Sequence, residues 1–401
     1  MQLSVCYTAR PVTVYRARAE TRGLENQVHL NNAGAALMPA PVADRLRAFL
    51  TAEERFGGYE TAAAEQAALE NFYTAGARLL NARPDEIAFV ENATRAWDMA
   101  FYALPLGPGD RVLTSHAEYG SNMIAYLHRA RQTGAEVAVI PADDTGTLDL
   151  DALTGMIDDR VKLISISHVP TGGGLVNPAA EVGAIARAHG IPYLLDACQS
   201  AGQMPLDVAA IGCDFLSATG RKYLRGPRGT GLLYVARRWI ERLDPPLLDQ
   251  HAAELISATE YVVRDDARRF ENWECFFAGK AALGLAIDYA MDWDLSAIWQ
   301  RVRHLADRLR AGLADLPHVT VTDRGRERCG LVTFTHSRQS ADAIKAAAAQ
   351  AGFNVSVSSG SGSLIDFRAR GLSAVTRASV HYYNTDDEVD RFTAFIGRIP
   401  S

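Results

Sequence analysis

Short apolar segments alternate with helical stretches over much of this sequence, and this alternation limits the folds open to it more than any other feature. The segments are rich in Val, Ile and Leu, and they fall at residues 86–90, 110–115, 136–141, 161–169, 192–197, 215–219 and 230–235. Helical stretches such as 178–190, which ends in glycine, lie between them. Strands that alternate with helices form βαβ units, so we predict an α/β fold built on a mainly parallel sheet.

The two ends of the chain follow different patterns. Residues 45–80 have helical periodicity with an interruption at Gly57 and Gly58. Beyond residue 290, helical and strand-like segments are found at 295–316, 318–323, 330–336, 341–352 and 377–384. Such a mixture is typical of a small α+β unit. We therefore expect a large α/β domain over residues 40–290, and a smaller domain that combines an N-terminal arm, residues 1–39, with residues 291–401.

Composition and charge argue against several classes of protein. The formal net charge of −6 gives no sign of a basic face for nucleic acid. No apolar run is long enough to span a membrane, and the first residues lack the apolar core of a secretory signal. The five cysteines are scattered and form no CxxC pair, so we expect no disulfide framework, no metal site and a cytoplasmic location. They are Cys6, Cys198, Cys213, Cys275 and Cys329.

The segment from residue 192 to residue 235 carries the most chemical information. One apolar run ends in Asp196, and a second runs into a glycine-rich loop that contains Lys222. In an open α/β sheet, ligands bind beyond the carboxyl ends of the strands, where both side chains would lie. Pyridoxal-5′-phosphate chemistry needs an acid that holds the pyridinium nitrogen and a lysine that carries the aldehyde as an imine. Either residue alone has a plainer explanation, as a helix cap or an exposed lysine, but the combination is more specific.

These segments resemble the class V aminotransferase superfamily of fold-type I pyridoxal-phosphate enzymes, which includes cysteine desulfurases, cysteine C–S lyases and isopenicillin N epimerase. The similarity extends from HLNNAGAALMP, which begins at residue 29, to RASVHYYNTDDEVDR, which ends at residue 391. The resemblance implies a pyridoxal phosphate cofactor, with Asp196 on the pyridinium, Gln199 on the ring oxygen and Lys222 in the imine. A His usually precedes the lysine in this family, and Arg221 stands there in this chain.

Two further segments of the resemblance concern the cofactor. VENATRAWDMAFYAL, residues 90–104, is similar to the family's phosphate segment, which implies that Ala93 and Thr94 bind the phosphate at a helix start. Thr219 is a second candidate for the phosphate. SHAEYGSNMIAY, residues 115–126, is similar to the segment whose aromatic residue stacks on the ring, which implies that Tyr119 does so here.

The resemblance also implies contacts to a small amino-acid substrate, in a homodimeric enzyme. Arg377 corresponds to the arginine that binds the substrate α-carboxylate, a task that suits its planar fork. Thr171 lies in the glycine-rich segment SHVPTGGGLVNP, which lacks the spacing of a dinucleotide loop and corresponds to a loop that faces the substrate. Asn32 is a further candidate for the same carboxylate.

Two departures from the family pattern bear on the reaction. Cysteine desulfurases carry a nucleophilic cysteine on a loop before the carboxylate arginine, and residues 354–376 of this chain contain none. This absence argues against a persulfide mechanism. Desulfurases also carry Gly-Thr after an RFE segment, where this chain has Trp273 and Glu274. A contact from that threonine to the phosphate of the partner subunit is therefore in doubt.

We expect a lyase that performs α,β-elimination, with C–S cleavage, on a cysteine-type amino acid or S-conjugate. Lys222 would abstract the α-proton, and no nucleophilic cysteine is needed. An aminotransferase or an amino-acid epimerase of the same superfamily is the main alternative, since either would use the same lysine and aspartate. A non-catalytic pyridoxal-phosphate carrier is a third possibility, against which the complete set of site residues argues.

Overall fold

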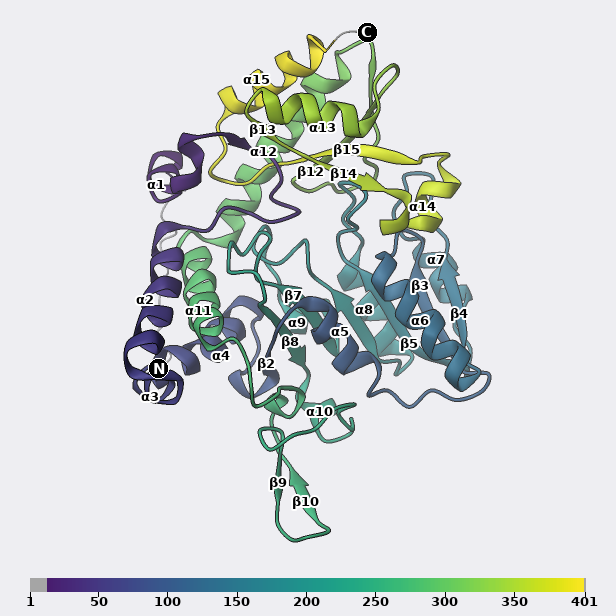
Figure 1. Ribbon diagram of the computed structural model, residues 1–401. Helices are drawn as coiled ribbons and strands as arrows, with labels where there is room; N and C mark the ends of the chain where they lie inside the picture. The colour runs from purple at the N-terminus through teal and green to yellow at the C-terminus, as the bar shows by residue number, and fades with distance from the viewer. Residues whose placement is uncertain (1–12, 400–401) are drawn as a thin grey trace, which may run out of the picture.

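A seven-stranded sheet forms the centre of the computed structural model, which describes residues 13–399 (Figure 1). In spatial order its strands are β2 (Ile87–Val90), β8 (Gly231–Val235), β7 (Phe215–Thr219), β6 (Tyr193–Asp196), β5 (Val161–Ser167), β3 (Arg111–Ser115) and β4 (Glu136–Ile140). Strand β8 is antiparallel to both of its neighbours, and the pairs from β7 to β4 are parallel. The predicted α/β fold with a mainly parallel sheet is confirmed. One of the five cysteines, Cys6, lies outside the described residues.

Helices cover both faces of this sheet, which explains why its inner strands read as continuous apolar runs. On one face, side chains such as Leu194 and Phe215 pack with helices α5 (Ala93–Phe101) and α6 (Gly120–Thr133). On the other face, Leu195 and Leu216 join the main core. Helices α4 (Gln66–Leu80), α8 (Ala179–Ala188) and α11 (Phe277–Asp292) contribute to that core. Successive side chains of a strand alternate between these two clusters, as the pleat requires.

The predicted helical segment near the N-terminus is confirmed as α2 (Ala40–Phe56), α3 (Gly58–Ala64) and α4. It begins five residues earlier than its periodicity indicated, since a proline occupies the first turn of α2, where its missing N–H costs nothing. The interruption falls at Gly57, whose φ of 95° suits glycine.

A second, antiparallel sheet lies at the C-terminal end, with order β11 (Val319–Val321), β12 (Leu331–His336), β15 (Ala374–Ser379) and β14 (Ser356–Ser359). Its helices are α12 (Leu295–Ala314), α13 (Ala341–Gln350) and α15 (Asp386–Gly397). The N-terminal strand β1 (Val28–His29) pairs in parallel with β13 (Phe353–Asn354). We predicted that residues 1–39 and 291–401 form one domain. This pairing supports that division of the chain, which stays a prediction.

The segment between β8 and α11 contains a hairpin that the sequence pattern did not predict. Its strands β9 (Ala253–Leu255) and β10 (Tyr261–Val263) project from the body of the molecule (Figure 1). The side chains of Leu255, Tyr261 and Val262 on this hairpin are exposed. Within residues 13–399, no helix is long and apolar enough to cross a bilayer.

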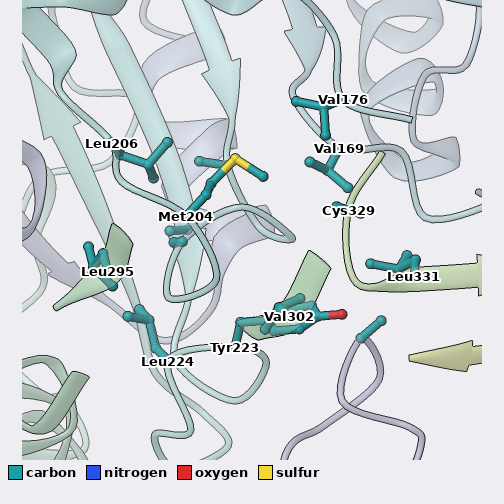
Figure 2. Packing of buried hydrophobic residues seen from close by; sticks show 14 of the residues in the cluster. Val169, Val176, Met204, Leu206, Tyr223, Leu224, Leu295, Val302, Cys329 and Leu331 are labelled. Carbon is teal, nitrogen blue, oxygen red and sulfur yellow. The ribbon is translucent and has the colours of Figure 1, made fainter. Parts of the chain in front are cut away.

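A buried apolar cluster lies where the segment after Lys222 meets the C-terminal part of the chain. Tyr223 and Leu224 are buried there with Val302 and Leu331 (Figure 2). The turn that carries Gly202 packs against the same segment: Gly202 has a φ of 90°, and a Cβ there would come 2.4 Å from the carbonyl carbon of Tyr223. Only glycine fits this approach, so the backbone after Lys222 is held on both sides.

Candidate active site

Eight of the residues predicted from the sequence line one cavity of about 270 Å³ at the carboxyl ends of β5, β6 and β7. They are Ala93, Thr94, Tyr119, Thr171, Asp196, Gln199, Thr219 and Lys222. The loops after β3, β5, β6 and β7 and the start of α5 bring them together from positions more than a hundred residues apart. A larger cleft of about 850 Å³, which Asp149, Trp299 and Glu327 line, contains none of the predicted residues.

Lys222 lies in a tight turn directly after β7. The N–H of Arg225 donates to the carbonyl of Lys222 at 2.9 Å, and the N–H of Gly226 donates to the carbonyl of Gly220 at 2.7 Å. Burial lowers the pKa of the Lys222 ammonium group. The neighbouring charge of Asp196 opposes this effect, and that of Arg221 adds to it. A lowered pKa favours the neutral amine, which is the form that attacks an aldehyde.

Asp196 ends strand β6 and has a defined donor for each carboxylate oxygen. The N–H of Cys198 donates to Oδ1 at 2.9 Å, and Nδ2 of Asn122 donates to Oδ2 at 3.0 Å. The residue is 8% exposed. The carboxylate therefore lies in a fixed orientation at the wall of the cavity, which suits a group that faces a ring nitrogen.

The start of helix α5 forms another wall of the cavity. The side chain of Asn92 caps this helix by accepting a hydrogen bond from the N–H of Arg95 at 2.9 Å. Gly231 on β8 permits the approach, because a Cβ there would come 2.8 Å from the carbonyl carbon of Asn92. The first N–H groups of a helix and its positive end suit an anion, so this wall fits a phosphate.

Two further cations, Arg221 and Arg228, also line the cavity. Neither forms an ion pair with any residue between 13 and 399. Their charges add to the positive end of α5 and would strengthen the attraction of a doubly charged phosphate.

Arg377 lies on β15 beside the cavity and contacts Thr171, which lines the cavity. Its Nη1 donates to Oγ1 of Thr171 at 2.7 Å, and its Nε donates to Oγ of Ser356 at 3.0 Å. The residue is 7% exposed, and burial lowers its pKa. No carboxylate in residues 13–399 pairs with it. A buried guanidinium whose partners are neutral oxygens is suited to bind an incoming carboxylate.

Asn32 lies apart from the cavity, and its amide already has partners. Its Nδ2 donates to the carbonyl of Ser379 at 2.7 Å, and its Oδ1 accepts a hydrogen bond from the hydroxyl of Tyr383. The residue is fully buried. Its predicted contact with a substrate carboxylate stays a prediction, and these bonds show a structural role that connects residues 29–33 to β15.

Sequence reasoning missed several residues that build the cavity. Among them are Asn92, Asn122, Cys198 and Arg228. An asparagine directly before a helical run is a recognisable cap, so Asn92 could have been found. The role of Asn122 had no signal in the sequence, because its partner Asp196 lies 74 residues away.

Most of the chain matches known proteins. The profile of the aminotransferase class-V family matches residues 28–392. The chain belongs to the aminotransferase class-V family. A protein from Salmonella gallinarum named cysteine desulfurase is 30% identical over 401 residues, with 96% of this chain and 98% of the relative covered.

Solved structures of this family share the fold over nearly the whole chain. The apo cysteine desulfurase from Thermococcus onnurineus has a TM-score of 0.89 at 25% identity, with 97% of this chain and 98% of that chain covered. A complex described as the cystine C–S lyase C-DES with cysteine persulfide has a TM-score of 0.86 at 23% identity, with 95% and 100% covered.

These relatives correct one expectation drawn from the sequence. We expected that the absence of a cysteine from residues 354–376 argues against a cysteine desulfurase, and that expectation is wrong. Relatives at 29% and 30% identity over more than nine-tenths of this chain are named cysteine desulfurases. The physical reason is that an empty loop excludes one position for a sulfur acceptor, whereas the cleavage itself depends on the cofactor and its lysine.

The cofactor of this class-V chain is pyridoxal phosphate, as predicted. The residues present fit that group: a lysine, a fixed carboxylate and a helix N-terminus lie around one cavity. The buried Oε1 of Gln199 has no hydrogen-bond partner within residues 13–399, which is consistent with a polar group bound there.

Proposed function

We propose that this class-V chain uses pyridoxal phosphate to cleave the C–S bond of cysteine or of an S-substituted cysteine. The surroundings of Arg377 carry the amino-acid part of this proposal, because a buried, unpaired guanidinium next to the Lys222 cavity fits an α-carboxylate. The names of the relatives support the C–S part, since proteins alike over most of this chain are named cysteine desulfurases.

Each residue of the site has a role in this proposal. Lys222 would hold the cofactor aldehyde at rest. Once the amino group of the substrate has replaced it there, the released neutral amine would take the α-proton of the substrate. Arg377 binds the α-carboxylate and so orients the Cα–H bond toward that amine. Asp196 would bind the pyridine nitrogen, and Tyr119 would stack on the ring. When bound, pyridoxal phosphate supplies an electron sink for the carbanion that forms at Cα.

The phosphate would lie against the start of α5. Ala93 and Thr94 offer N–H groups there, Thr219 offers a hydroxyl, and Arg228 offers charge. Gln199 would face the ring oxygen. Its amide nitrogen donates to the carbonyl of Ala33 at 3.1 Å, which fixes the side chain at the edge of the cavity.

A product analysis tests the proposal. Purified protein with pyridoxal phosphate is incubated with L-cysteine in the presence of dithiothreitol, and with L-cystine or S-substituted cysteines in its absence, each with or without a 2-oxoacid. We expect sulfide or a thiol to be released without the 2-oxoacid. Alanine as the carbon product identifies the desulfurase course, and pyruvate with ammonia identifies elimination. The Lys222→Ala protein is the control. It should release no sulfide or thiol and should form neither alanine nor pyruvate.

Two results would contradict C–S cleavage. Amino transfer that depends strictly on the added 2-oxoacid, with no sulfur released, would identify an aminotransferase. Solvent deuterium that enters Cα with inversion, with the C–S bond intact, would identify an epimerase.

We also propose that the chain forms a homodimer through a surface that includes the β9–β10 hairpin. Leu255, Tyr261 and Val262 are each more than half exposed on this hairpin, and Trp273, in the segment between the hairpin and α11, is 52% exposed. Exposed apolar side chains of this size on a projecting element are typical of an interaction surface.

A further inference from the structure

A second buried carboxylate, Glu118, lies directly behind Asp196. It precedes helix α6, is 3% exposed, and took no part in the roles assigned above. Burial, the largest influence, raises its pKa, and the neighbouring charge of Asp196 raises it further. Two carboxylates this close in a dry region need donors between them, or the folded state would lose stability.

Glu118 is surrounded by donors. The backbone N–H of Tyr119 donates to Oε1 at 2.7 Å, and that of Ser167 donates to Oε2 at 3.1 Å. The hydroxyls of Ser167 and Thr114 donate at 2.6 Å and 2.9 Å. The two backbone groups can only donate, so the carboxylate is fixed between β3 and β5 and cannot rotate without breaking several bonds.

Asn122 connects the two acids. Its Nδ2 donates to Oε1 of Glu118 at 3.0 Å and to Oδ2 of Asp196 at 3.0 Å. An amide nitrogen has two N–H bonds, and here each acid receives one. Because both partners can only accept when ionised, the amide has a single favourable orientation, and Glu118 determines it.

We propose that Glu118 and Asn122 are positioning residues for the cofactor's pyridine nitrogen. Glu118 orients the amide of Asn122, and the amide fixes Oδ2 of Asp196 while the N–H of Cys198 fixes Oδ1. The remaining lone pairs of Asp196 then face the cavity. This inference concerns the cofactor alone, so it holds whichever bond of the substrate is cleaved.

The test follows the protonation of the cofactor and uses no substrate. In the Asn122→Ala protein, reconstituted with pyridoxal phosphate labelled with 15N in the ring, the pyridine nitrogen should lose its proton at a lower pH than in the wild type. A misplaced Asp196 stabilises the pyridinium less, which lowers its pKa. Release of the cofactor on dialysis should be about 10- to 100-fold faster, since a bond to a charged group is lost.

Three further variants separate positioning from stability. Glu118→Gln keeps the size of the side chain but presents an N–H group to the donors, so it should shift the 15N titration in the same direction. Asn122→Ser keeps a short hydrogen-bond donor, so it should fold even if Asn122→Ala does not. Its shift of the 15N titration should be smaller than that of Asn122→Ala. Tyr126→Phe removes a buried hydrogen bond from the next turn of α6, to Ser165 Oγ at 2.7 Å, and should shift the titration much less than Asn122→Ala does.

A wild-type 15N titration and wild-type cofactor retention in folded Asn122→Ala or Asn122→Ser protein would overturn the proposal. An equal shift in Tyr126→Phe would do the same, because it would assign the effect to general loosening of α6. Neither outcome depends on whether the enzyme cleaves C–S bonds.

Discussion

Arg377 shows how a single residue can indicate a substrate. A buried charge without a charged partner is unfavourable, and a fold keeps one only where something compensates it. Thr171 and Ser356 supply neutral oxygens, which satisfy the geometry of the guanidinium but not its charge. The missing anion fits the carboxylate of an amino acid.

Arg377→Ala should lower kcat/KM for amino-acid substrates by about 10- to 150-fold, since a hydrogen bond to a charged group contributes about 1.5–3 kcal/mol. Arg377→Lys keeps the charge but loses the fork, so its loss should be smaller. Steady-state kinetics on the substrate found in the product analysis measures both. A loss of about twofold or less in Arg377→Ala would place the carboxylate elsewhere in the cavity.

Arg221 acts on Lys222 through its charge. In the apoenzyme, pyridoxal phosphate should bind to Lys222 at a rate that rises with pH through the lowered pKa of the ammonium group, since only the neutral amine attacks. Arg221→Gln removes a positive charge and should raise that pKa, so the rate profile should move to higher pH. Stopped-flow absorbance of the bound cofactor measures this.

Arg228→Gln is the control for that experiment. Arg228 also lines the cavity but is not among the main influences on the pKa of Lys222. The pH profile of cofactor binding should therefore move less in Arg228→Gln than in Arg221→Gln. A profile that stays in place in Arg221→Gln, or that moves equally in both variants, would contradict the role given to Arg221.

At the scale of elements, the site depends on how closely β8 approaches the start of α5. Gly231 on β8 leaves no room for a side chain, because a Cβ would lie 2.8 Å from the carbonyl carbon of Asn92 and 2.9 Å from the carbonyl oxygen of Ala218. Both obstacles are backbone atoms, which cannot rotate away as a side chain can. The position of the helix N-terminus therefore depends on a residue of a neighbouring strand.

Gly231→Val should displace the start of α5, lower the free energy of unfolding by about 1–3 kcal/mol and weaken cofactor binding. Gly155→Ala is a matched control, since nothing lies within 4 Å of its Cβ position in α7 (Leu150–Gly155), and its effect should stay within about 1 kcal/mol. Thermal unfolding and cofactor titration measure these effects. Wild-type cofactor affinity in Gly231→Val would show that the approach is not needed.

At the scale of the whole molecule, the cavity lies at the carboxyl edge of the large sheet, and the small antiparallel sheet meets it where Arg377 contacts Thr171. Arg377 comes from the small sheet, Asp196 ends strand β6 of the large sheet, and Lys222 lies in the turn after β7. The cluster around Tyr223, Val302 and Leu331 joins the two parts (Figure 2). This packing sets the distance between the carboxylate site and the lysine.

The projecting hairpin provides a prediction at the same scale. Val262→Glu places a charge on an exposed apolar strand, and it should shift the protein from dimer to monomer, because a buried unpaired charge disfavours an interface. Light scattering coupled to size-exclusion chromatography measures the mass. A monomeric wild type, or a variant that remains fully dimeric, would contradict the proposed surface.

The sequence by itself determined the succession of strands and helices along the chain, because the strands of the large sheet are short apolar runs, and all but the edge strand β4 are buried over most of their length. It also determined the cofactor, because the segments around Asp196 and Lys222 carry the pattern of the class-V family. The residues that lie nearest the ring stay a prediction. These features are local, and a local pattern is visible without a fold.

Only the tertiary structure decided which distant residues support them. Asn122 contacts Asp196 across 74 positions, and Arg377 contacts Thr171 across 206. The hairpin β9–β10 and the bonds that use the amide of Asn32 likewise had no signal in the sequence. Such contacts arise where chain segments meet beyond the ends of the strands, and that meeting depends on the packing of the two sheets rather than on any local periodicity.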